Sequence, residues 1–323
     1  MAKFNNIYIE NFYTLLGKNE YNPVISSKCD SNYNSYLVNK KTFEETESDY
    51  QVMAINGLLK KNNNTIKNID LLIAGDLQNQ LFSSHYAANT FDVPFLGVFS
   101  ACASFVEAMI IGALYIQKSS KKVVISTSSH NLVAEKQFRF PIEYGMNRKK
   151  VNSFTVTGAT SALLSTKESN IKLENYTIGR VISVGHKDTN DMGSPMAFAA
   201  ADTLYRHFKE TKRDPSYYDL ILTGDLGYYG LRLLKKIFLK KYNMKLDNID
   251  DAGKLIFDIN KNSKFAGGSG PVCLPLMFFS TIVKNKKYKK VLLVGTGSLH
   301  STFSANIKKD MCAVAHLVSV VIE

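Results

Sequence analysis

Cys102 is the residue whose type and position most suggest chemistry. It stands in a run of small residues, SACAS, between an apolar segment at 94–99 typical of a strand and one at 102–117 typical of a helix. A thiol at a helix N-terminus faces the positive end of the dipole and unpaired N–H groups, which lower its pKa and favour the thiolate. A small cysteine also suits tight packing at a strand–helix turn, and position alone does not separate a nucleophile from a packing residue.

A nucleophilic thiol needs a basic partner, usually histidine, to take its proton. His130 ends a predicted strand at 123–128 and is followed by Asn131. Either side chain would donate a hydrogen bond to a carboxylate, although a histidine in a turn can be purely structural. His300 ends the corresponding strand of the second half and is the weaker candidate for a substitute base.

A glycine-rich segment, FAGGSG at 265–270, predicts an anion site. Its N–H groups are expected to open a second helix, and glycines allow a ligand to approach the backbone closely. Two helix N-termini that converge on one crevice bind an anion without buried cations. The predicted donors are the N–H groups of Cys102, Ala103, Gly267, Gly268, Ser269 and Gly270.

The elements that position these residues are duplicated. Segment 69–77 (IDLLIAGDL) and segment 218–226 (YDLILTGDL) are near copies, 149 residues apart (218 − 69). Two further pairs follow in the same order, 121–130 with 289–300 and 157–165 with 312–321. Three ordered pairs indicate an ancient duplication rather than a chance likeness of apolar strands.

Each half then has the order β–α–β–α–β–β around a buried central helix. This order predicts an α/β fold, in outline a five-layered αβαβα sandwich, with its site where the halves meet. The halves are assigned to residues 1–175 and 176–323, fused into one globular unit. Residues 1–36, rich in Asn and Tyr, are expected to be an extended lead-in, followed by an amphipathic helix at 43–61.

The composition is that of a soluble globular protein. The chain has 323 residues, 45% of them hydrophobic, and a mean hydropathy of −0.11. The longest apolar stretch, around 105–116, contains Glu107 and is too short to cross a bilayer. The first residues lack the apolar core of a signal peptide, so we expect cytoplasmic synthesis. The four cysteines have no zinc-like spacing and are predicted to be free thiols, with no metal site.

The net charge is +12 and comes from lysine pairs spread along the chain. Such pairs are either a solvated surface or a means of attracting an anionic ligand or an anionic membrane. Nucleic acid is not expected as a partner, because the chain has no nucleic-acid motif and no basic stretch interleaved with aromatic residues.

Several motifs together resemble the stage V sporulation protein AD family, within the thiolase-like superfamily. Two are specific to that family, DMGSPMAFAAADT at 191–203 and FAGGSG at 265–270. The others are AGDLQNQ (74–80), FSACASFVEA (99–108), STSSHN (126–131), QFRFPIEYG (137–145), TVTGA (155–159) and LILTGDL (220–226). The resemblance runs from about residue 69 to the C-terminus, and the part before residue 50 matches poorly.

The resemblance implies a thiolase-like sandwich of two pseudo-symmetric halves that binds a ligand instead of catalysing a reaction. The implied ligand is dipicolinate (pyridine-2,6-dicarboxylate), free or as its calcium chelate, taken up into the developing spore. The implied partners are membrane proteins of the spore dipicolinate channel, and the implied location is peripheral, on the anionic inner membrane of the spore. Superfamily members usually dimerise through the strand that corresponds to 94–99, so a homodimer is expected.

The superfamily's catalytic bases are not matched in this sequence. One histidine of the condensing enzymes belongs to a GH-x-x-G-A-x-G turn, and alignment on residues 267–270 puts Lys264 in its place. The other follows the strand that ends here in LTGDL, where Asp225 stands instead. We therefore interpret Cys102 as a vestigial nucleophile and predict neither catalysis nor a cofactor. The alternatives are an acyl-CoA or acyl-carrier-protein acyltransferase or thiolase-type condensing enzyme that uses Cys102, and a purely structural scaffold.

Further ligand contacts are predicted from the loop at 137–150 and from the twin Gly-Asp ends. Arg139 or Tyr144 would cover the ligand ring. Asp225, with its twin Asp76, would repel a free dianion but help to hold a calcium chelate. Turn or helix capping is the commoner role for such aspartates.

Overall fold

The computed structural model describes residues 2–19, 23–119, 121–138, 149–257 and 265–323. In these residues, eleven strands join into one sheet with two parts. The first part contains, in spatial order, β1 (Lys3–Leu16), β7 (Gly158–Ser165), β5 (Val123–Ser129), β3 (Leu71–Gly75) and β4 (Phe95–Gly97), with β2 (Ser31–Asn32) beside β1. The second part contains β8 (Ile171–Thr177), β13 (Cys312–Ile322), β12 (Lys290–Leu299), β9 (Leu220–Thr223) and β10 (Ile249–Asp251).

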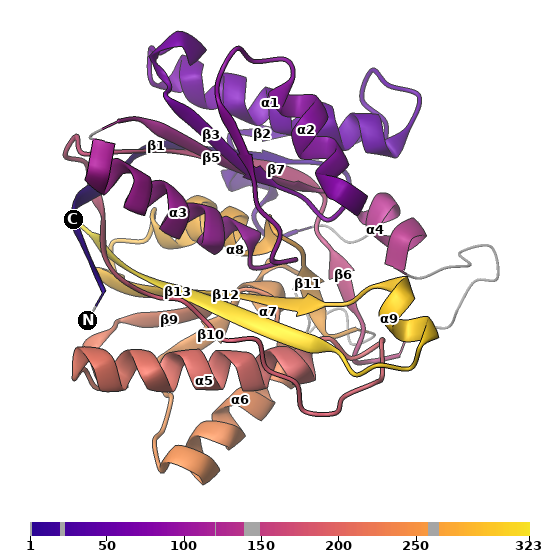
Figure 1. Ribbon diagram of the computed structural model, residues 1–323, viewed down its shortest axis with the longest axis vertical. Helices are drawn as coiled ribbons and strands as arrows, with labels where there is room; N and C mark the ends of the chain where they lie inside the picture. The colour runs from indigo at the N-terminus through magenta and orange to yellow at the C-terminus, as the bar shows by residue number, and fades with distance from the viewer. Residues whose placement is uncertain (1, 20–22, 120, 139–148, 258–264) are drawn as a thin grey trace.

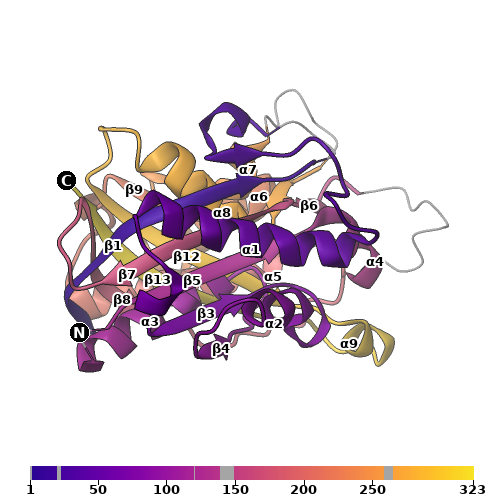
Figure 2. The same ribbon diagram turned by 90° about the horizontal axis from the view of Figure 1, so that it is seen from above.

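Helices form three layers around the two parts of the sheet (Figures 1 and 2). The outer layers are α1 (Phe43–Lys61) with α2 (Phe82–Ala88) and α5 (Gly193–Thr211) with α6 (Gly227–Tyr242). The middle layer is α3 (Ser104–Ser119) with α8 (Cys273–Met277), which a π-helical turn (Phe278–Ile282) extends. The predicted five-layered αβαβα sandwich is therefore confirmed.

Shorter elements complete the described residues. A two-stranded sheet pairs β6 (Ser153–Thr155) with β11 (Gly267–Ser269). The short helices are α4 (Asn131–Phe138), α7 (Ala252–Ile256) and α9 (Thr302–Asn306). Single 3-10 turns lie at Ser26–Lys28, Ile66–Asn68, Asn79–Leu81 and Pro215–Tyr217.

Local sequence explains why the main elements begin and end where they do. The Thr42 hydroxyl oxygen accepts a hydrogen bond from the Glu45 N–H at 3.2 Å and donates to the Glu45 carboxylate at 3.0 Å, which caps α1. Strands β3, β5 and β9 are buried along their whole length. Continuous burial is expected of parallel strands covered by helices on both faces, and it explains why their sequences are almost entirely apolar or small.

The repeated segments occupy equivalent places in the two parts of the sheet. β3 and β9 both lie next to the edge strand, β5 and β12 come next, and β7 and β13 follow. The pseudo-symmetry predicted from the three sequence pairs is therefore confirmed. The division at residue 175 stays a prediction, and that residue lies within β8.

The N-terminal segment is not the extended lead-in that its sequence suggested. β1 is a strand of fourteen residues inside the sheet, and it pairs antiparallel with both β7 and β8. Ile7, Ile9 and Leu15 are almost wholly buried. Asn and Tyr separate the apolar residues of this segment, so the sequence shows no clear strand pattern. β1 joins the two parts of the sheet.

The central helix α3 is a core element. The apolar helix is longer than the stretch at 105–116 that the sequence indicated. Residues 101–119 are long and apolar enough to cross a membrane by length and composition, which corrects the expected length, and no other helix in the described part of the chain is. Most of this segment is buried, however, and α3 lies between the two parts of the sheet (Figure 1). An all-round apolar helix in this position is expected of the core of a large soluble domain.

Candidate functional site

Cys102 lies in a tight turn just before α3 rather than on the helix itself. Ala101 has a positive φ of 49°, an uncommon conformation for a residue with a side chain. The Ser104 hydroxyl fixes the turn, since it accepts from the Ser100 N–H at 3.0 Å and donates to the Ala101 carbonyl at 2.8 Å. The Ala103 N–H donates to the Ser100 carbonyl at 3.0 Å, so Ala103 is not the free donor that the sequence predicted.

The Cys102 thiol is held in its neutral form. Its side chain is buried, and burial is the main reason that its pKa lies well above the usual value. The Asp225 carboxylate raises the pKa further, while the Gly270 N–H opposes these effects. Of the two readings that the sequence left open, the raised pKa favours a packed neutral thiol over a thiolate, because desolvation and a neighbouring acid outweigh the helix dipole.

Asp225 follows β9 and reaches Cys102 from the second half of the chain. It is 1% exposed, and among the described residues neither carboxylate oxygen has a hydrogen bond of ordinary geometry. The Gly270 N–H and the Cys102 thiol still lie close enough to favour its charged form. Burial and the nearby Asp251 carboxylate outweigh them and raise the pKa of Asp225 well above its usual value, which favours the neutral acid.

The twin aspartates have diverged in role. Asp76 accepts hydrogen bonds from the N–H groups of Gln78 and Ser84, both at 2.8 Å, and so caps α2 as a turn aspartate is expected to do. In the second half, Asp251 instead caps the corresponding helix, α6. It accepts from the Leu226 and Gly227 N–H groups at 2.9 Å at the start of α6. Asp225 is thereby released from capping and is left facing the thiol.

The glycine-rich segment does not open a helix as predicted. Gly267, Gly268 and Ser269 form β11, paired in parallel with β6. Gly270 follows with a φ of +108°, which a residue with a side chain would adopt only under strain, and α8 begins at Cys273. The segment instead brings the Gly270 N–H to Cys102 and Asp225 and the Ser269 hydroxyl to the cavity wall.

A small cavity of about 50 Å³ lies above Cys102, between the two halves. Two aromatic side chains, Phe99 and Phe138, give it apolar walls. Hydroxyl groups come from Thr155 and Ser298 as well as Ser269. The full lining is Leu77, Phe99, Ala101, Cys102, Ala134, Glu135, Phe138, Thr155, Thr189, Met192, Ser269, Ser298 and His300.

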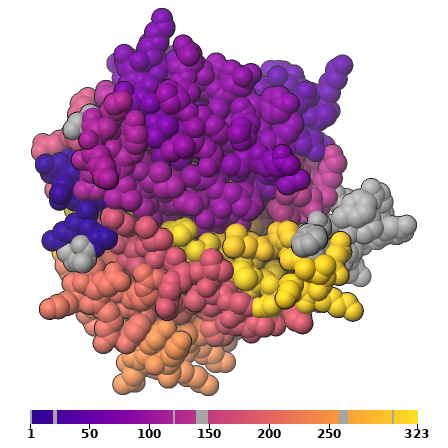
Figure 3. Space-filling model, viewed as in Figure 1, coloured from indigo at the N-terminus to yellow at the C-terminus, as the bar shows by residue number. Residues whose placement is uncertain are grey.

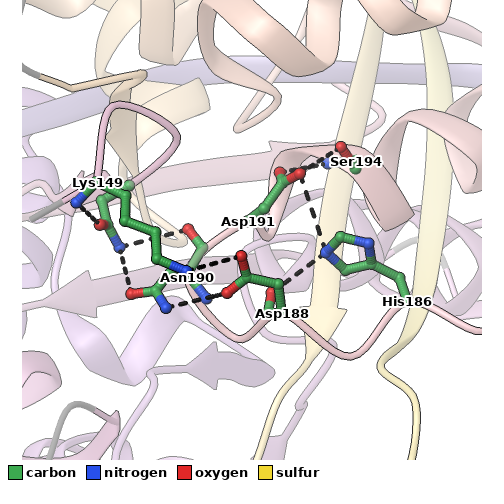
Figure 4. Close-up of polar contacts among 7 residues, drawn as sticks. Lys149, His186, Asp188, Asn190, Asp191 and Ser194 are labelled. Carbon is green, nitrogen blue, oxygen red and sulfur yellow. Dashed lines mark hydrogen bonds and ion pairs between the residues drawn. The ribbon is translucent and has the colours of Figure 1, made fainter.

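The DMGSP segment forms one wall through a polar network (Figure 4). Asp191 accepts hydrogen bonds from the Ser194 N–H at 3.0 Å and the Ser194 hydroxyl at 2.6 Å, which fixes the start of α5. Asp188 accepts from the Lys149 ammonium at 3.1 Å and from the Asn190 N–H at 3.0 Å. These contacts hold the loop that presents Thr189 and Met192 to the cavity.

His130 and Asn131 lie away from this cavity. The His130 Nε2 lies 3.0 Å from the Tyr36 carbonyl, its Nδ1 lies 3.3 Å from the Leu132 N–H, and its ring stacks on Phe43. Burial lowers the pKa of His130 to about 4, so the ring is neutral at physiological pH. The Asn131 amide donates to the Thr155 carbonyl at 3.2 Å. Their predicted ligand contacts stay predictions, although the structure commits these groups to protein partners.

The other candidates divide between the cavity and the undescribed segment. His300, the weaker histidine candidate, lines the cavity together with Cys102. Its ring lies 6.0 Å from that of Phe138. Arg139 and Tyr144 fall outside the described residues. Cys273, a second buried thiol at the start of α8, was not among the predicted site residues. Burial raises its pKa, and the charges of Asp225 and Asp251 raise it further. The sequence feature that could have indicated Cys273 is its place at the start of the helix equivalent to the one that follows Cys102.

The described residues contain no group of three or more His, Cys, Asp or Glu side chains that would hold a metal ion. The polar side chains at the cavity carry hydroxyl, thiol, carboxyl and imidazole groups.

Comparisons with known proteins agree with this geometry. The profile of the family described as stage V sporulation protein AD (SpoVAD) matches residues 2–321, so the likeness includes the N-terminal part that the motifs left unmatched. Stage V sporulation protein AD of Bacillus subtilis (strain 168) is 37% identical over 314 residues, which cover 96% of this chain and 93% of that protein.

Solved structures show the fold. A variant of OleA from Xanthomonas campestris matches with a TM-score of 0.63 at 14% identity, over 99% of both chains. The 3-oxoacyl-(acyl carrier protein) synthase III from Xanthomonas oryzae pv. oryzae matches with a TM-score of 0.61 at 12% identity, over 99% of both chains. The thiolase-like architecture is thus confirmed, while such low identities carry nothing about activity.

Proposed function

The chain belongs to the stage V sporulation protein AD family, and we propose that it binds dipicolinate, free or as its calcium chelate, without catalysing a reaction. Family membership gives it a role in sporulation. The proposed role is that of a binding component of the machinery that takes dipicolinate up into the developing spore.

The observation that carries the proposal is the neutral pair of Cys102 and Asp225. Acyl transfer needs a thiolate and a base. Here the pKa of the thiol is raised, so the sulfur keeps its proton at neutral pH. Burial and the Asp251 carboxylate also raise the pKa of the adjacent Asp225 carboxyl, which favours its protonated form, and in that form it takes no proton from the thiol. The pair supports binding better than nucleophilic attack.

The same pair suits an anionic ligand. A protonated thiol and a protonated acid add no negative charge beneath the cavity, so they do not repel a dicarboxylate. Thr155, Ser269 and Ser298 line the cavity with hydroxyl groups, which can donate to carboxylate oxygens. The Ser269 hydroxyl accepts from the Ser153 hydroxyl at 3.1 Å and keeps its own proton for a ligand. Among the described residues, the Ser298 hydroxyl has only the weak acceptor Met311 Sδ, at 3.8 Å, to give up. Phe99 and Phe138 offer flat apolar surfaces to an aromatic ring.

Binding also requires the wall to move. Sites for small organic ligands usually measure about 300 Å³ or more. The cavity here is about 50 Å³, so dipicolinate enters only if side chains such as Phe99 and Phe138 shift.

Titration calorimetry tests the proposal on the full chain. Dipicolinate and its calcium chelate are titrated separately. The double variant Ser269→Ala with Ser298→Ala is expected to weaken binding about a hundredfold or more, since each of the two lost hydrogen bonds to a charged group costs roughly 1.5–3 kcal/mol. Ser216→Ala, on an exposed turn, is the matched control. Absence of binding by either form of the ligand below millimolar concentration would refute the proposal.

Catalysis is the second candidate, because the solved structures of similar fold include a 3-oxoacyl synthase and because Cys102 stands before the central helix. Incubation with acyl-CoA followed by mass spectrometry separates the two. A stable acyl adduct that disappears in Cys102→Ala would favour an acyltransferase. A pure scaffold, the third candidate, would give neither an adduct nor a calorimetric signal.

We further propose that the protein works as a homodimer on the inner membrane of the spore, beside membrane proteins of the dipicolinate channel. The edge strand β4 supports the dimer, because Leu96 and the neighbouring Phe99 are about half exposed, at 47% and 48%. Light scattering on the wild type and on Leu96→Glu tests it. A monomeric wild type would count against the dimer.

A further inference from the structure

The outer helix α6 concentrates positive charge. Five of its sixteen residues are Lys or Arg and none is acidic, and Lys245 follows shortly after its end. These six cations are Arg232, Lys235, Lys236, Lys240, Lys241 and Lys245, and all are exposed. Their summed charge of +6 is half of the chain's net charge of +12.

These charges have no acidic partners among the described residues. No ion pair within the described part of the chain includes any of the six, although Arg232 lies over the Tyr228 ring and Lys241 over the Tyr242 ring. The acidic residues Asp202 and Glu210 of the neighbouring helix α5 already form ion pairs with other cations. Asp202 pairs with Arg180 and Arg206, and Glu210 pairs with Arg206. The field of α6 therefore points outward without being neutralised.

Apolar side chains are exposed among these cations. Leu239 is 50% exposed and Tyr228 is 38% exposed. A surface groove along the helix is lined by Tyr229, Arg232, Leu233, Lys235, Lys236 and Leu239. In Figures 1 and 3, the C-terminal part of α6 projects from the lower end of the molecule. A flat partner would reach it without obstruction.

We propose that this α6 face docks the protein onto an anionic lipid bilayer. The cations would meet the headgroup phosphates while Leu239 and Tyr228 enter the boundary between headgroups and acyl chains. The apolar face of α6, with Leu234 and Phe238, is buried in the protein, so the exposed cations supply most of the attraction to anionic lipid. The exposed Leu239 and Tyr228 add to it by entering the interface. The inference rests on the proposed peripheral membrane location and deepens it by naming the face.

The exposed leucine favours lipid over nucleic acid. A phosphodiester backbone would attract the lysines equally well, but it offers no apolar phase for Leu239. A bilayer binds both the cations and the apolar side chains. Each lysine near an anionic surface increases the affinity about fivefold. Both the charge and the leucine are therefore expected to matter.

Co-sedimentation of the full chain with vesicles tests the charges. The wild type is expected to bind vesicles of phosphatidylglycerol with phosphatidylcholine and not phosphatidylcholine alone. Lys235→Glu with Lys236→Glu is expected to weaken binding about 25-fold or more, from two lysines at about fivefold each. The matched control, Lys308→Glu with Lys309→Glu, changes the net charge equally on another exposed loop and is expected to change binding less than about threefold. Equal losses in both pairs would overturn the proposal.

A second comparison tests the apolar part and separates lipid from nucleic acid. Leu239→Ser is expected to weaken vesicle binding about threefold or more, whereas Ile307→Ser, with a side chain 52% exposed, leaves it unchanged. Duplex DNA bound as tightly as the anionic vesicles, with no effect of Leu239→Ser on either, would overturn lipid as the partner.

Dipicolinate titration of the same variants keeps the two proposals apart. All are expected to retain the wild-type ligand affinity, which also shows that they fold. A wild type that binds vesicles but not dipicolinate would refute the ligand and leave the docking face standing. The reverse result would refute the docking face alone.

Discussion

Asp225 and Cys102 come from opposite halves of the chain and lie against one another in the buried floor of the cavity. The carboxylate, if ionised, disfavours the thiolate, and burial disfavours both charges. The contact exists because Asp251 has taken over the capping of α6. The aspartate at the end of the second repeated strand thus affects the protonation of a thiol that belongs to the first half.

Asp225→Asn should make Cys102 more reactive. The amide has a similar shape but no negative charge, so at alkaline pH, where Asp225 of the wild type ionises, the pKa of the Cys102 thiol should be lower in the variant and more thiolate should form. The measurement is the rate of iodoacetamide alkylation of the Cys102 peptide against pH, read by mass spectrometry. Cys312, for comparison, should be unaffected. An unchanged Cys102 profile would mean that burial alone sets its pKa.

Asp251→Ala should destabilise the fold strongly. It leaves the N–H groups of Leu226, Gly227 and Lys254 without their side-chain acceptor, at a cost of about 3–5 kcal/mol. Asp214→Ala removes the cap of an exposed 3-10 turn and should cost about 1 kcal/mol or less. Urea denaturation measures both. Similar losses in the two variants would contradict the role assigned to Asp251.

Stability should fall between pH 6.5 and pH 4 partly because of His207. Its ring bonds to Tyr218 and Thr177, and burial lowers its folded pKa to about 4, below an unfolded value of about 6.5. The folded state binds fewer protons, so this stability is full above the unfolded pKa and is lost as the pH drops toward the folded pKa.

The loss should reach about 3 kcal/mol for this one group. His207→Gln has no such proton, so its unfolding free energy should change less over this range than that of the wild type. Parallel pH profiles for the two proteins would argue against a buried neutral His207.

Gly297→Ala should distort the Cys102 turn. A Cβ at this position of β12 would lie 2.1 Å from the Ser100 carbonyl oxygen, so the strand or the turn must move, at a cost of about 1–3 kcal/mol or more. Gly185→Ala is the control, since its φ is +74° but nothing lies within 4 Å of the new Cβ. Faster alkylation of Cys102 in Gly297→Ala only is expected. Equal effects would show that strain, not the close approach, matters.

The fold could be predicted largely from local patterns. The bounds of α1 match the prediction, because its apolar residues recur at helical spacing within one segment. β9 also matches, since a buried parallel strand shows itself as an apolar run. β1 could not be recognised, because its apolar residues alternate irregularly with Asn and Tyr and its burial depends on strands that come much later in the chain.

The site was less predictable, because its chemistry depends on contacts between distant segments. The position of Cys102 before a helix suggested a thiolate, but the depth of burial and the approach of Asp225 cannot be read from spacing. His130 was expected to face a ligand, whereas the backbone of Tyr36, 94 residues earlier, takes its Nε2. The release of Asp225 from capping depends on Asp251, which the repeat does not include.

β1 makes the topology strongly non-local. Tyr8 pairs with Ser165, 157 residues later in the chain (165 − 8), and Ile7 pairs with Leu173. Contacts of such high sequence separation slow folding, because a long loop must close before any of them forms. During synthesis, a nascent chain would hold an unpaired strand rich in Tyr and Ile until both β7 and β8 had left the ribosome. Production of this protein should therefore depend on protection from aggregation more than its final stability suggests.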